Sequence, residues 1–279
     1  MSATLDALIA ENRELRRELA LRDERLRAIE RSRWWRVHPR RLLPARSERV
    51  DSRQPTERTT TEASDVAMRS ANTAPMDDPS LASFHADVLA RGSFTEDWVT
   101  TRFAKWRPVL DELEGRPTRI LEIGSFEGLS ASFLLWRLPL AHITCVDPFV
   151  GIPEHAGVES DDLERTFDSN VALVDATRVR KLVGDSKRRL LDLLEEEDRF
   201  DLVYVDGSHL GLDVLVDAAL SWQLVAPSGV IVFDDYRWAY LGEDPLLRPG
   251  KAIDVFCALL EGKHDVLFAD DQIALRRIS

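Results

Sequence analysis

Short apolar runs alternate with longer amphipathic segments from about residue 80 to the end of the chain. The runs predict strands at Arg119–Ile123, His142–Val146, Lys181–Val183, Asp201–Val205, Val230–Asp234, His264–Phe268 and Gln272–Arg276. The other segments predict helices at Phe94–Leu113, Gly128–Leu138, Leu163–Asn170, Ser186–Glu196, Leu212–Leu224 and Ala252–Leu260. Apolar strands that alternate with helices are typical of a mainly parallel sheet covered on both faces. We therefore predict one α/β domain over residues 80–279.

The first 32 residues follow a different, seven-residue pattern. Positions spaced alternately by three and four carry Leu5, Leu8, Asn12, Leu15, Leu19, Arg22, Leu26 and Ile29. This spacing is the a/d seam of a coiled coil, and it predicts a helix over residues 1–32 that forms a homodimer. A single solvated helix, or a helix packed on its own domain, is the alternative interpretation.

A basic segment and a polar linker, together residues 33–79, join this helix to the domain. Arginines surround Trp34 and Trp35 within residues 31–49, a composition that suits a membrane interface or an anionic partner. An ordinary basic linker is the alternative for this Arg/Trp segment. Residues 50–78 are rich in Ser, Thr, Arg and acidic residues, which is typical of a flexible linker.

Charge and composition narrow the class of protein. The formal net charge is -12, which argues against nucleic acid as a partner because such binding needs a basic surface. No apolar run approaches the length of a membrane span, and no secretory signal is evident. Cys145 and Cys257 lie in apolar surroundings and are interpreted as core residues. We expect a cytoplasmic protein, with peripheral contact to the inner membrane face as an option for residues 31–49.

The first predicted strand runs into a segment with two glycines, Glu122-Ile-Gly124-Ser125-Phe126-Glu-Gly128. Gly124 allows a tight turn and close approach of a ligand, and Gly128 opens a helix whose amides favour an anionic group. The three-glycine spacing of dinucleotide-binding proteins is missing. S-adenosylmethionine (SAM) carries a carboxylate and no pyrophosphate, so it suits this looser turn. An ordinary strand-to-helix turn is the alternative.

Polar residues also stand where the next four strands end. The second strand ends at Asp147, which could accept hydrogen bonds from both ribose hydroxyls of a nucleoside. The third ends in Gly184-Asp185-Ser186, whose polar side chains could bind an adenine edge. Asp206-Gly-Ser-His209 and Asp234-Asp235 follow the fourth and fifth. Ligands bind at the carboxyl ends of parallel strands, so these residues predict one site.

Four stretches carry a resemblance to a known family: "ILEIGSFEGLSASFLL", "ITCVDPFVG", "FDLVYVDGSHLGLDVLVDA" and "GVIVFDDYRW". The region from about Phe94 to Arg277 resembles class I SAM-dependent methyltransferases of the methyltransferase-24 group, which is related to macrocin O-methyltransferase and cephalosporin-hydroxylase-type enzymes. The resemblance implies a Rossmann-like seven-stranded sheet with its last strand antiparallel. It also implies SAM contacts at Glu122, Gly124, Ser125, Gly128, Asp147 and Asp185, with Phe126, Gly184 and Ser186 as further candidates in the same turns.

The resemblance further implies a divalent metal, Mg²⁺ in the first instance, held by Asp206, Asp234 and Asp235. Three converging carboxylates repel one another unless a cation or a proton relieves them. Mg²⁺ would lower the pKa of an acceptor hydroxyl. His209, next to Asp206, is the candidate general base. Alternatively, these side chains only hold the strand ends together, with His209 orienting the Asp206 loop.

Together these features predict methyl transfer from SAM to an oxygen of a small-molecule or glycan acceptor. Heptads followed by an Arg/Trp segment look similar to extensions of bacterial enzymes that act on cell-surface polysaccharides, which favours a sugar. The main alternative is a non-catalytic SAM- or nucleotide-binding scaffold of a polysaccharide-synthesis complex. A nicotinamide-dependent oxidoreductase is disfavoured by the missing third glycine.

Overall fold

The structure, a computed structural model, describes residues 79–150, 160–238 and 244–278. The predicted coiled coil (1–32), the Arg/Trp segment (31–49) and almost all of the predicted linker (33–79) lie outside the described residues. Within the described ranges, no helix combines the length and the apolar character that crossing a membrane requires.

Seven strands form one sheet in the order β3-β2-β1-β4-β5-β7-β6. Their bounds are β1 Thr118–Ile123, β2 Ala141–Asp147, β3 Val179–Val183, β4 Phe200–Val205, β5 Val225–Phe233, β6 His264–Ala269 and β7 Ile273–Arg277. The first five strands pair in parallel, and β7 pairs antiparallel with both β5 and β6. The predicted Rossmann-like sheet with an antiparallel last strand is confirmed.

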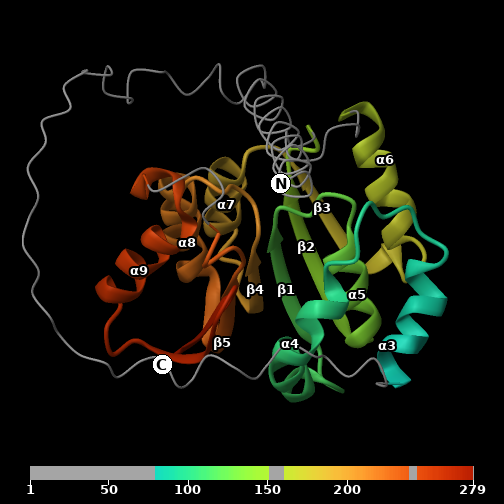
Figure 1. Cartoon of the computed structure of the whole chain (residues 1–279), viewed down its shortest axis with the longest axis horizontal. Coiled ribbons are helices and arrows are strands. Elements are labelled where there is room, and N and C mark those ends of the chain that lie inside the picture. Colours follow the sequence, from blue (N-terminus) through green and yellow to red (C-terminus); the bar gives the residue numbers. More distant parts are fainter. Residues whose placement is uncertain (1–78, 151–159, 239–243, 279) are drawn as a thin grey trace, which may run out of the picture. The chain divides into compact units, whose positions relative to one another are not determined.

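Helices cover both faces of this sheet (Figure 1). Their bounds are α3 Pro79–Phe84, α4 Val99–Leu113, α5 Leu129–Arg137, α6 Ser160–Val171, α7 Ser186–Glu195, α8 Gly211–Leu224 and α9 Pro249–Leu259, with a π-helical turn at His85–Leu89 and 3₁₀ turns at Ala176–Arg178 and Pro245–Leu247. α7, α8 and α9 lie on one face, and α4 and α5 lie on the other (Figure 1).

Alternation along the strands divides the core between these two faces, because successive strand side chains point to opposite sides. The face under α7, α8 and α9 is aliphatic with a few aromatic rings, and it includes Ile123, Val205, Phe233, Leu190, Val214, Ile253 and Phe256. The rings of Phe233 and Phe256 pack edge-on, 5.6 Å apart. Burial of each such side chain contributes roughly 1.5–3 kcal/mol to stability.

The face under α4 and α5 is more aromatic. Trp106 of α4 lies edge-on to Tyr204 of β4, with ring centroids 5.0 Å apart, and also contacts Phe133 of α5. The indole nitrogen of Trp106 donates to Gln272 at 2.9 Å. These contacts bring α4 against the middle of the sheet and direct the Tyr204 hydroxyl toward the carboxyl end of β4.

Two predicted boundaries were wrong by five residues each. The helix predicted from Phe94 begins at Val99, because Asp97 accepts hydrogen bonds from the amides of Val99 (3.1 Å) and Thr100 (3.0 Å) and so satisfies the first turn. Trp98, directly before the first residue of α4, is 40% exposed. The strand predicted from Val230 begins five residues earlier, beyond an irregularity in its pairing with β4.

The segment that precedes α4 is tied to the domain by Asn170 at the end of α6. The Asn170 amide exchanges two hydrogen bonds with the backbone of Ser93, each 2.8 Å, and donates a third to the carbonyl of Glu127 at 2.8 Å. The carboxylate of Glu127 in turn accepts the amide and the hydroxyl of Thr95, both at 2.6 Å. Residues 93–95 are therefore fixed directly against the turn after β1.

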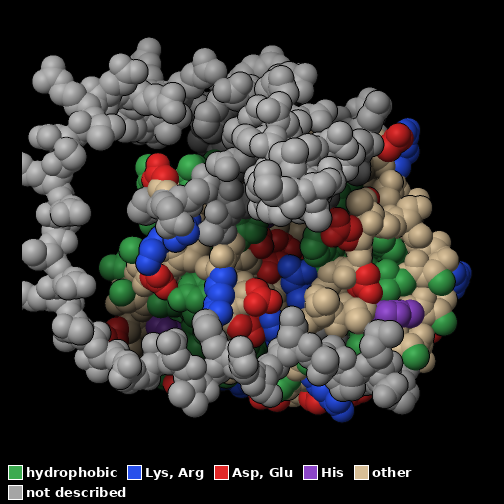
Figure 2. Space-filling model, in the orientation of Figure 1, with side chains coloured by type: hydrophobic (Ala, Val, Ile, Leu, Met, Phe, Trp, Pro, Cys, Tyr) green, Lys and Arg blue, Asp and Glu red, His purple; other side chains and the backbone are tan. Residues whose placement is uncertain are grey.

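On the described part of the face in Figure 2, acidic and basic side chains lie intermixed. In the described part of the domain, ion pairs join neighbouring elements, such as Arg180 with Glu196 (2.8 Å) and Lys181 with Asp168 (2.6 Å).

We predict that Asn170→Ala lowers the free energy of unfolding by about 2–4 kcal/mol, because it removes two part-buried hydrogen bonds to the Ser93 backbone and a buried one to the Glu127 carbonyl. Urea denaturation of the full chain measures this change. Gln223→Ala is the matched control, since the Gln223 amide makes one exposed bond of 3.3 Å, and we expect less than about 0.5 kcal/mol there. Equal losses in the two variants would contradict the anchoring role.

Candidate active site

The carboxyl ends of β1, β2, β4 and β5 meet where the strand order reverses, between β1 and β4. The amide of Gly124 donates to the carbonyl of Val146 (2.9 Å), and the amide of Asp206 donates to that of Ile123 (2.8 Å). The turns after these strands are therefore directly connected. Open parallel sheets bind ligands at such a reversal.

Residues 124–128 form the glycine turn. Gly124 has φ +84°, and a Cβ at this position would lie 2.0 Å from the carbonyl oxygen of Asp206. Any side chain here would clash with backbone, so glycine is required both by conformation and by space. Phe126 adopts φ +45°, a left-handed conformation that is unusual for a bulky residue. Backbone strain of this kind is concentrated at functional sites.

Asp147 holds the glycine turn closed. Its Oδ2 accepts the amides of Ser125 (2.8 Å) and Phe126 (2.9 Å), and its Oδ1 accepts the amide of Phe149 (2.6 Å). Burial raises the pKa of Asp147, and these three amides oppose the shift. A carboxylate has about four acceptor positions, so roughly one remains for a ligand hydroxyl. Its predicted role toward two ribose hydroxyls remains a prediction.

Glu122 lies beneath the glycine turn and is fully buried. Its carboxylate accepts the Ser130 hydroxyl (2.6 Å) and lies 3.6 Å from the Cys145 sulfur. Burial raises the pKa of Glu122 to about 6, opposed by the hydroxyls of Ser125 and Ser130. Glu122, which was predicted to contact the cofactor, therefore supports the glycine turn through these hydrogen bonds.

The turn after β3 lies beside Asp147. The amide of Gly184 donates to the Asp147 carbonyl at 3.0 Å, and Asp185 is exposed at the start of α7. The Ser186 hydroxyl, predicted to bind an adenine edge, instead donates to Asp217 of α8 at 2.8 Å. Gly184 and Asp185 thus stand at the predicted site, while Ser186 connects α7 to α8.

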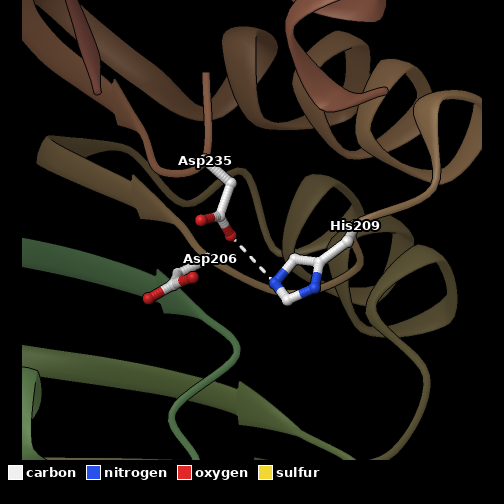
Figure 3. A group of neighbouring side chains, drawn as sticks. All are labelled: Asp206, His209 and Asp235. Carbon is white, nitrogen blue, oxygen red and sulfur yellow. Dashed lines mark ion pairs between the residues drawn. The ribbon is translucent and has the colours of Figure 1, made fainter. Parts of the chain in front are cut away.

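Asp206, His209 and Asp235 form a compact cluster, which we call the His209 group (Figure 3). The Asp235 carboxylate lies 2.8 Å from His209 Nε2, and one ligand atom from each residue lies within 4.8 Å of the other two. The His209 ring also packs on Trp238, with centroids 4.6 Å apart. Burial and the charges of Asp234 and Asp235 raise the pKa of Asp206 well above its ordinary range.

Asp234 turns away from the His209 group. Its Oδ2 accepts the Arg102 guanidinium and the Tyr204 hydroxyl, both at 2.7 Å. Its Oδ1 accepts the Gln272 amide (3.1 Å) and the amide of Asp235 (2.9 Å). Burial would raise the pKa of Asp234, but Arg102 and the other donors hold it below its ordinary value. The predicted trio of Asp206, Asp234 and Asp235 is thus divided, with His209 in the place expected for Asp234.

Sequence reasoning missed Arg102 and Tyr204. Tyr204 lies two residues before Asp206 on the same face of β4, and its hydroxyl contacts both Asp206 (2.9 Å) and Asp234 (2.7 Å). The alternation of β4 could have placed it there. Arg102 comes from α4, ahead of the whole sheet, and no local pattern marks it.

A family model described as "Methyltransferase domain" matches residues 121–236, from β1 through the glycine turn to the His209 group. This segment is a methyltransferase domain. The match confirms the resemblance to the methyltransferase-24 group that the four sequence stretches carry.

Relatives of the methyltransferase domain match parts of the chain. R132 of Acanthamoeba polyphaga mimivirus is 29% identical over 123 residues, which are 43% of this chain and 53% of that protein. MycE methyltransferase from the mycinamycin biosynthetic pathway, in complex with Mg, S-adenosylhomocysteine (SAH) and mycinamycin VI, has a TM-score of 0.51 and 18% identity, covering 72% of this chain and 54% of that one. The O-methyltransferase from Bacillus cereus in complex with SAH has a TM-score of 0.51 and 16% identity, covering 77% and 94%.

The chain spans about half the length of R132 and of MycE. At these identities the two solved structures show a shared fold, and the sheet described above has the seven strands and the antiparallel last strand that the resemblance implies.

Two buried carboxylates of α8, Asp213 and Asp217, accept hydrogen bonds from neighbouring elements of the methyltransferase domain. Asp213 accepts Lys187 of α7 (2.5 Å) and the hydroxyl of Ser208 (3.0 Å), which lies between Asp206 and His209. Asp217 accepts Ser186, as described above, and is 1% exposed. Burial raises the pKa of Asp217 to about 7, opposed by Ser186.

We predict that Asp217 makes stability depend on pH. The pKa of this carboxyl is about 7 in the folded state against an ordinary 3.8. Its contribution is therefore complete below about pH 4, and it is lost as the pH rises toward 7, at no more than about 1.4 kcal/mol per pH unit. Asp217→Asn should raise the free energy of unfolding at pH 8 by about 1–3 kcal/mol and leave it nearly unchanged at pH 4.

Urea denaturation at both pH values measures this difference. Asp265→Asn, at an exposed aspartate, is the matched control and should show no pH-dependent gain. A variant no more stable than the wild type at pH 8 would show that Asp217 is ionised in the folded domain without cost.

Proposed function

We propose that this methyltransferase domain transfers the methyl group of SAM to a hydroxyl oxygen of a small-molecule or sugar acceptor. One observation carries the proposal: Asp206 and His209 lie on the turn that contacts the glycine turn, and the His209 imidazole is a group that can take a proton. Nearby titratable groups of this kind are what general-base catalysis needs. The Bacillus cereus neighbour is an O-methyltransferase, which supports oxygen as the accepting atom.

The glycine turn and its neighbours fit SAM. Gly124 lets the glycine turn approach the turn after β4, and the amides that begin α5 after Gly128 suit a carboxylate. Asp147 retains an acceptor position for a hydroxyl, and Asp185 is exposed beside it. When bound, SAM supplies a methyl group on a sulfonium sulfur, so that the acceptor oxygen bonds to the methyl carbon while the carbon–sulfur bond breaks and SAH leaves.

His209 and Asp235 remove the acceptor proton in this proposal. A neutral hydroxyl is a poor nucleophile, and its oxygen gains reactivity as the proton moves to the His209 imidazole. Asp235, 2.8 Å from Nε2, orients the ring and stabilises the imidazolium that forms. The packing of Trp238 against the ring further restricts its orientation.

A divalent cation also fits the His209 group, and when it is bound His209 serves as its ligand and not as the base. Asp206, Asp235 and His209 would hold it through two carboxylates and one imidazole, a donor set that many divalent ions accept. When bound, it would relieve the repulsion between the carboxylates and lower the pKa of an acceptor hydroxyl. MycE was crystallised with Mg, which supports a cation in this fold. In this proposal Asp234 is not a ligand, because its four hydrogen-bond donors occupy it.

We predict that SAM and SAH raise the melting temperature of the full chain, and that NAD does not. A ligand at 100 times its dissociation constant adds about 2.7 kcal/mol to the stability of the folded state. Thermal unfolding measures this effect. Asp147→Asn should weaken SAH binding roughly tenfold, because it loosens the glycine turn, whereas Asp265→Asn should not change it. A wild type whose melting temperature rises with neither SAM nor SAH would contradict the proposal.

We predict that His209→Asn lowers kcat roughly 10²–10⁴-fold and leaves SAH affinity within about threefold of wild type. The assay follows SAH release with a panel of hydroxylated acceptors, including free sugars. Trp222→Phe is a control on an aromatic side chain of the opposite face, packed on Phe256. Full SAH binding without turnover on any acceptor, in the wild type itself, would favour the non-catalytic scaffold.

A further inference from the structure

Arg102 is a cation that α4 inserts into the acidic end of the sheet. Its guanidinium lies 2.7 Å from Asp234 Oδ2, with side-chain exposures of 19% for Arg102 and 3% for Asp234. Nη1 of the Arg102 guanidinium donates to the carbonyl of Trp98 at 3.2 Å. The guanidinium also lies over the Trp98 ring, 5.6 Å from its centroid. Three separate contacts therefore fix this arginine in one orientation.

The ion pair removes Asp234 from the set of possible metal ligands. Arg102, Tyr204, Gln272 and the Asp235 amide together fill the roughly four acceptor positions of its carboxylate. A metal ion could bind Asp234 only by displacing a donor from a buried site, which leaves that donor unpaired.

The backbone supports the same division. Asp235 adopts φ +56°, which turns its side chain toward His209, while Asp234 faces Arg102 and Tyr204. Adjacent acidic residues are thus directed to different partners. One pairs with a fixed internal cation, and the other stands in the His209 group.

The result is a site with a particular charge and donor set. Arg102 cancels the charge of Asp234, so the ligands left to a divalent ion carry two carboxylate charges, from Asp206 and Asp235, and one imidazole nitrogen, from His209. Mg²⁺ and Ca²⁺ prefer all-oxygen sites, whereas imidazole favours later first-row transition ions.

We propose that Arg102 determines the cation selectivity of the His209 group: by engaging Asp234, it leaves a two-carboxylate, one-imidazole site that selects a transition-metal dication over Mg²⁺. This inference rests on the cation part of the proposed function. Arg102 acts here through Asp234 and is a positioning residue, since it touches neither the ion nor the acceptor.

The test compares Co²⁺ and Mg²⁺ binding to the full chain by calorimetry, without SAM. Visible absorption of bound Co²⁺ reports nitrogen ligation independently of turnover. For the wild type we expect Co²⁺ to bind at least roughly tenfold more tightly than Mg²⁺. In Arg102→Gln, Asp234 becomes available, so Mg²⁺ affinity should rise roughly tenfold and the selectivity should shrink. Arg107→Gln, on an exposed position of the same helix, should match the wild type.

A second variant covers the case in which Arg102→Gln fails to fold. The double variant Arg102→Gln/Asp234→Asn replaces both partners by neutral groups of similar shape, which is far less costly than removing one. It leaves the net charge unchanged, so the ratio of Co²⁺ to Mg²⁺ affinity should stay within about threefold of wild type. Loss of Co²⁺ binding in this double variant would show that Asp234 is a ligand and would overturn the inference.

The inference also fails if the wild type binds Mg²⁺ as tightly as Co²⁺, or if Arg102→Gln leaves the ratio unchanged. These results are separable from failure of the proposed function, because SAH binding to the same preparations is measured in parallel. A chain that binds SAH but shows no selectivity retains the proposed methyl transfer and loses only the role of Arg102.

Discussion

The backbone contact between the turn after β1 and the turn after β4 constrains everything else at this end of the sheet. At Gly124 the two turns approach so closely that a Cβ on this residue would lie 2.0 Å from the Asp206 carbonyl oxygen. The glycine turn is therefore in direct backbone contact with the turn that carries Asp206 and His209. For a reaction between two bound molecules, a fixed separation of their binding sites is the main requirement, because alignment replaces a collision in solution.

Buried carboxyl groups are the second organising feature of the domain, and each is accommodated differently. Asp147 accepts three backbone amides, Asp234 faces a fixed arginine, and Glu122 and Asp217 accept hydroxyls while burial raises their pKa values to about 6 and about 7. Arg102 and the other donors hold the pKa of Asp234 below its ordinary value, whereas burial raises the pKa of Asp147 against the effect of its three amides. The carboxyls with only hydroxyl partners lie beneath the turns, where they connect helices and strands.

Much of this arrangement could be predicted from the sequence, because the strand-end residues follow apolar runs whose direction the alternation with helices fixes. Gly124, Asp147, Asp206 and Asp235 therefore fell at the correct edge of the sheet. Adjacent aspartates at 234 and 235 give no sign, however, that a left-handed backbone sends them to different partners. Arg102 could not be found either, since its contact with Asp234 depends on how α4 packs through Trp106 on Tyr204.

The left-handed conformation of Asp235 has a consequence for how this domain can vary. A non-glycine residue with positive φ lowers folding stability by about 1–3 kcal/mol, and glycine would relieve most of that strain. Selection for thermal stability alone would thus favour glycine here and remove the carboxylate beside His209. Retention of aspartate at this position in thermostable descendants of the chain would therefore record selection for chemistry, because the fold by itself gains nothing from it.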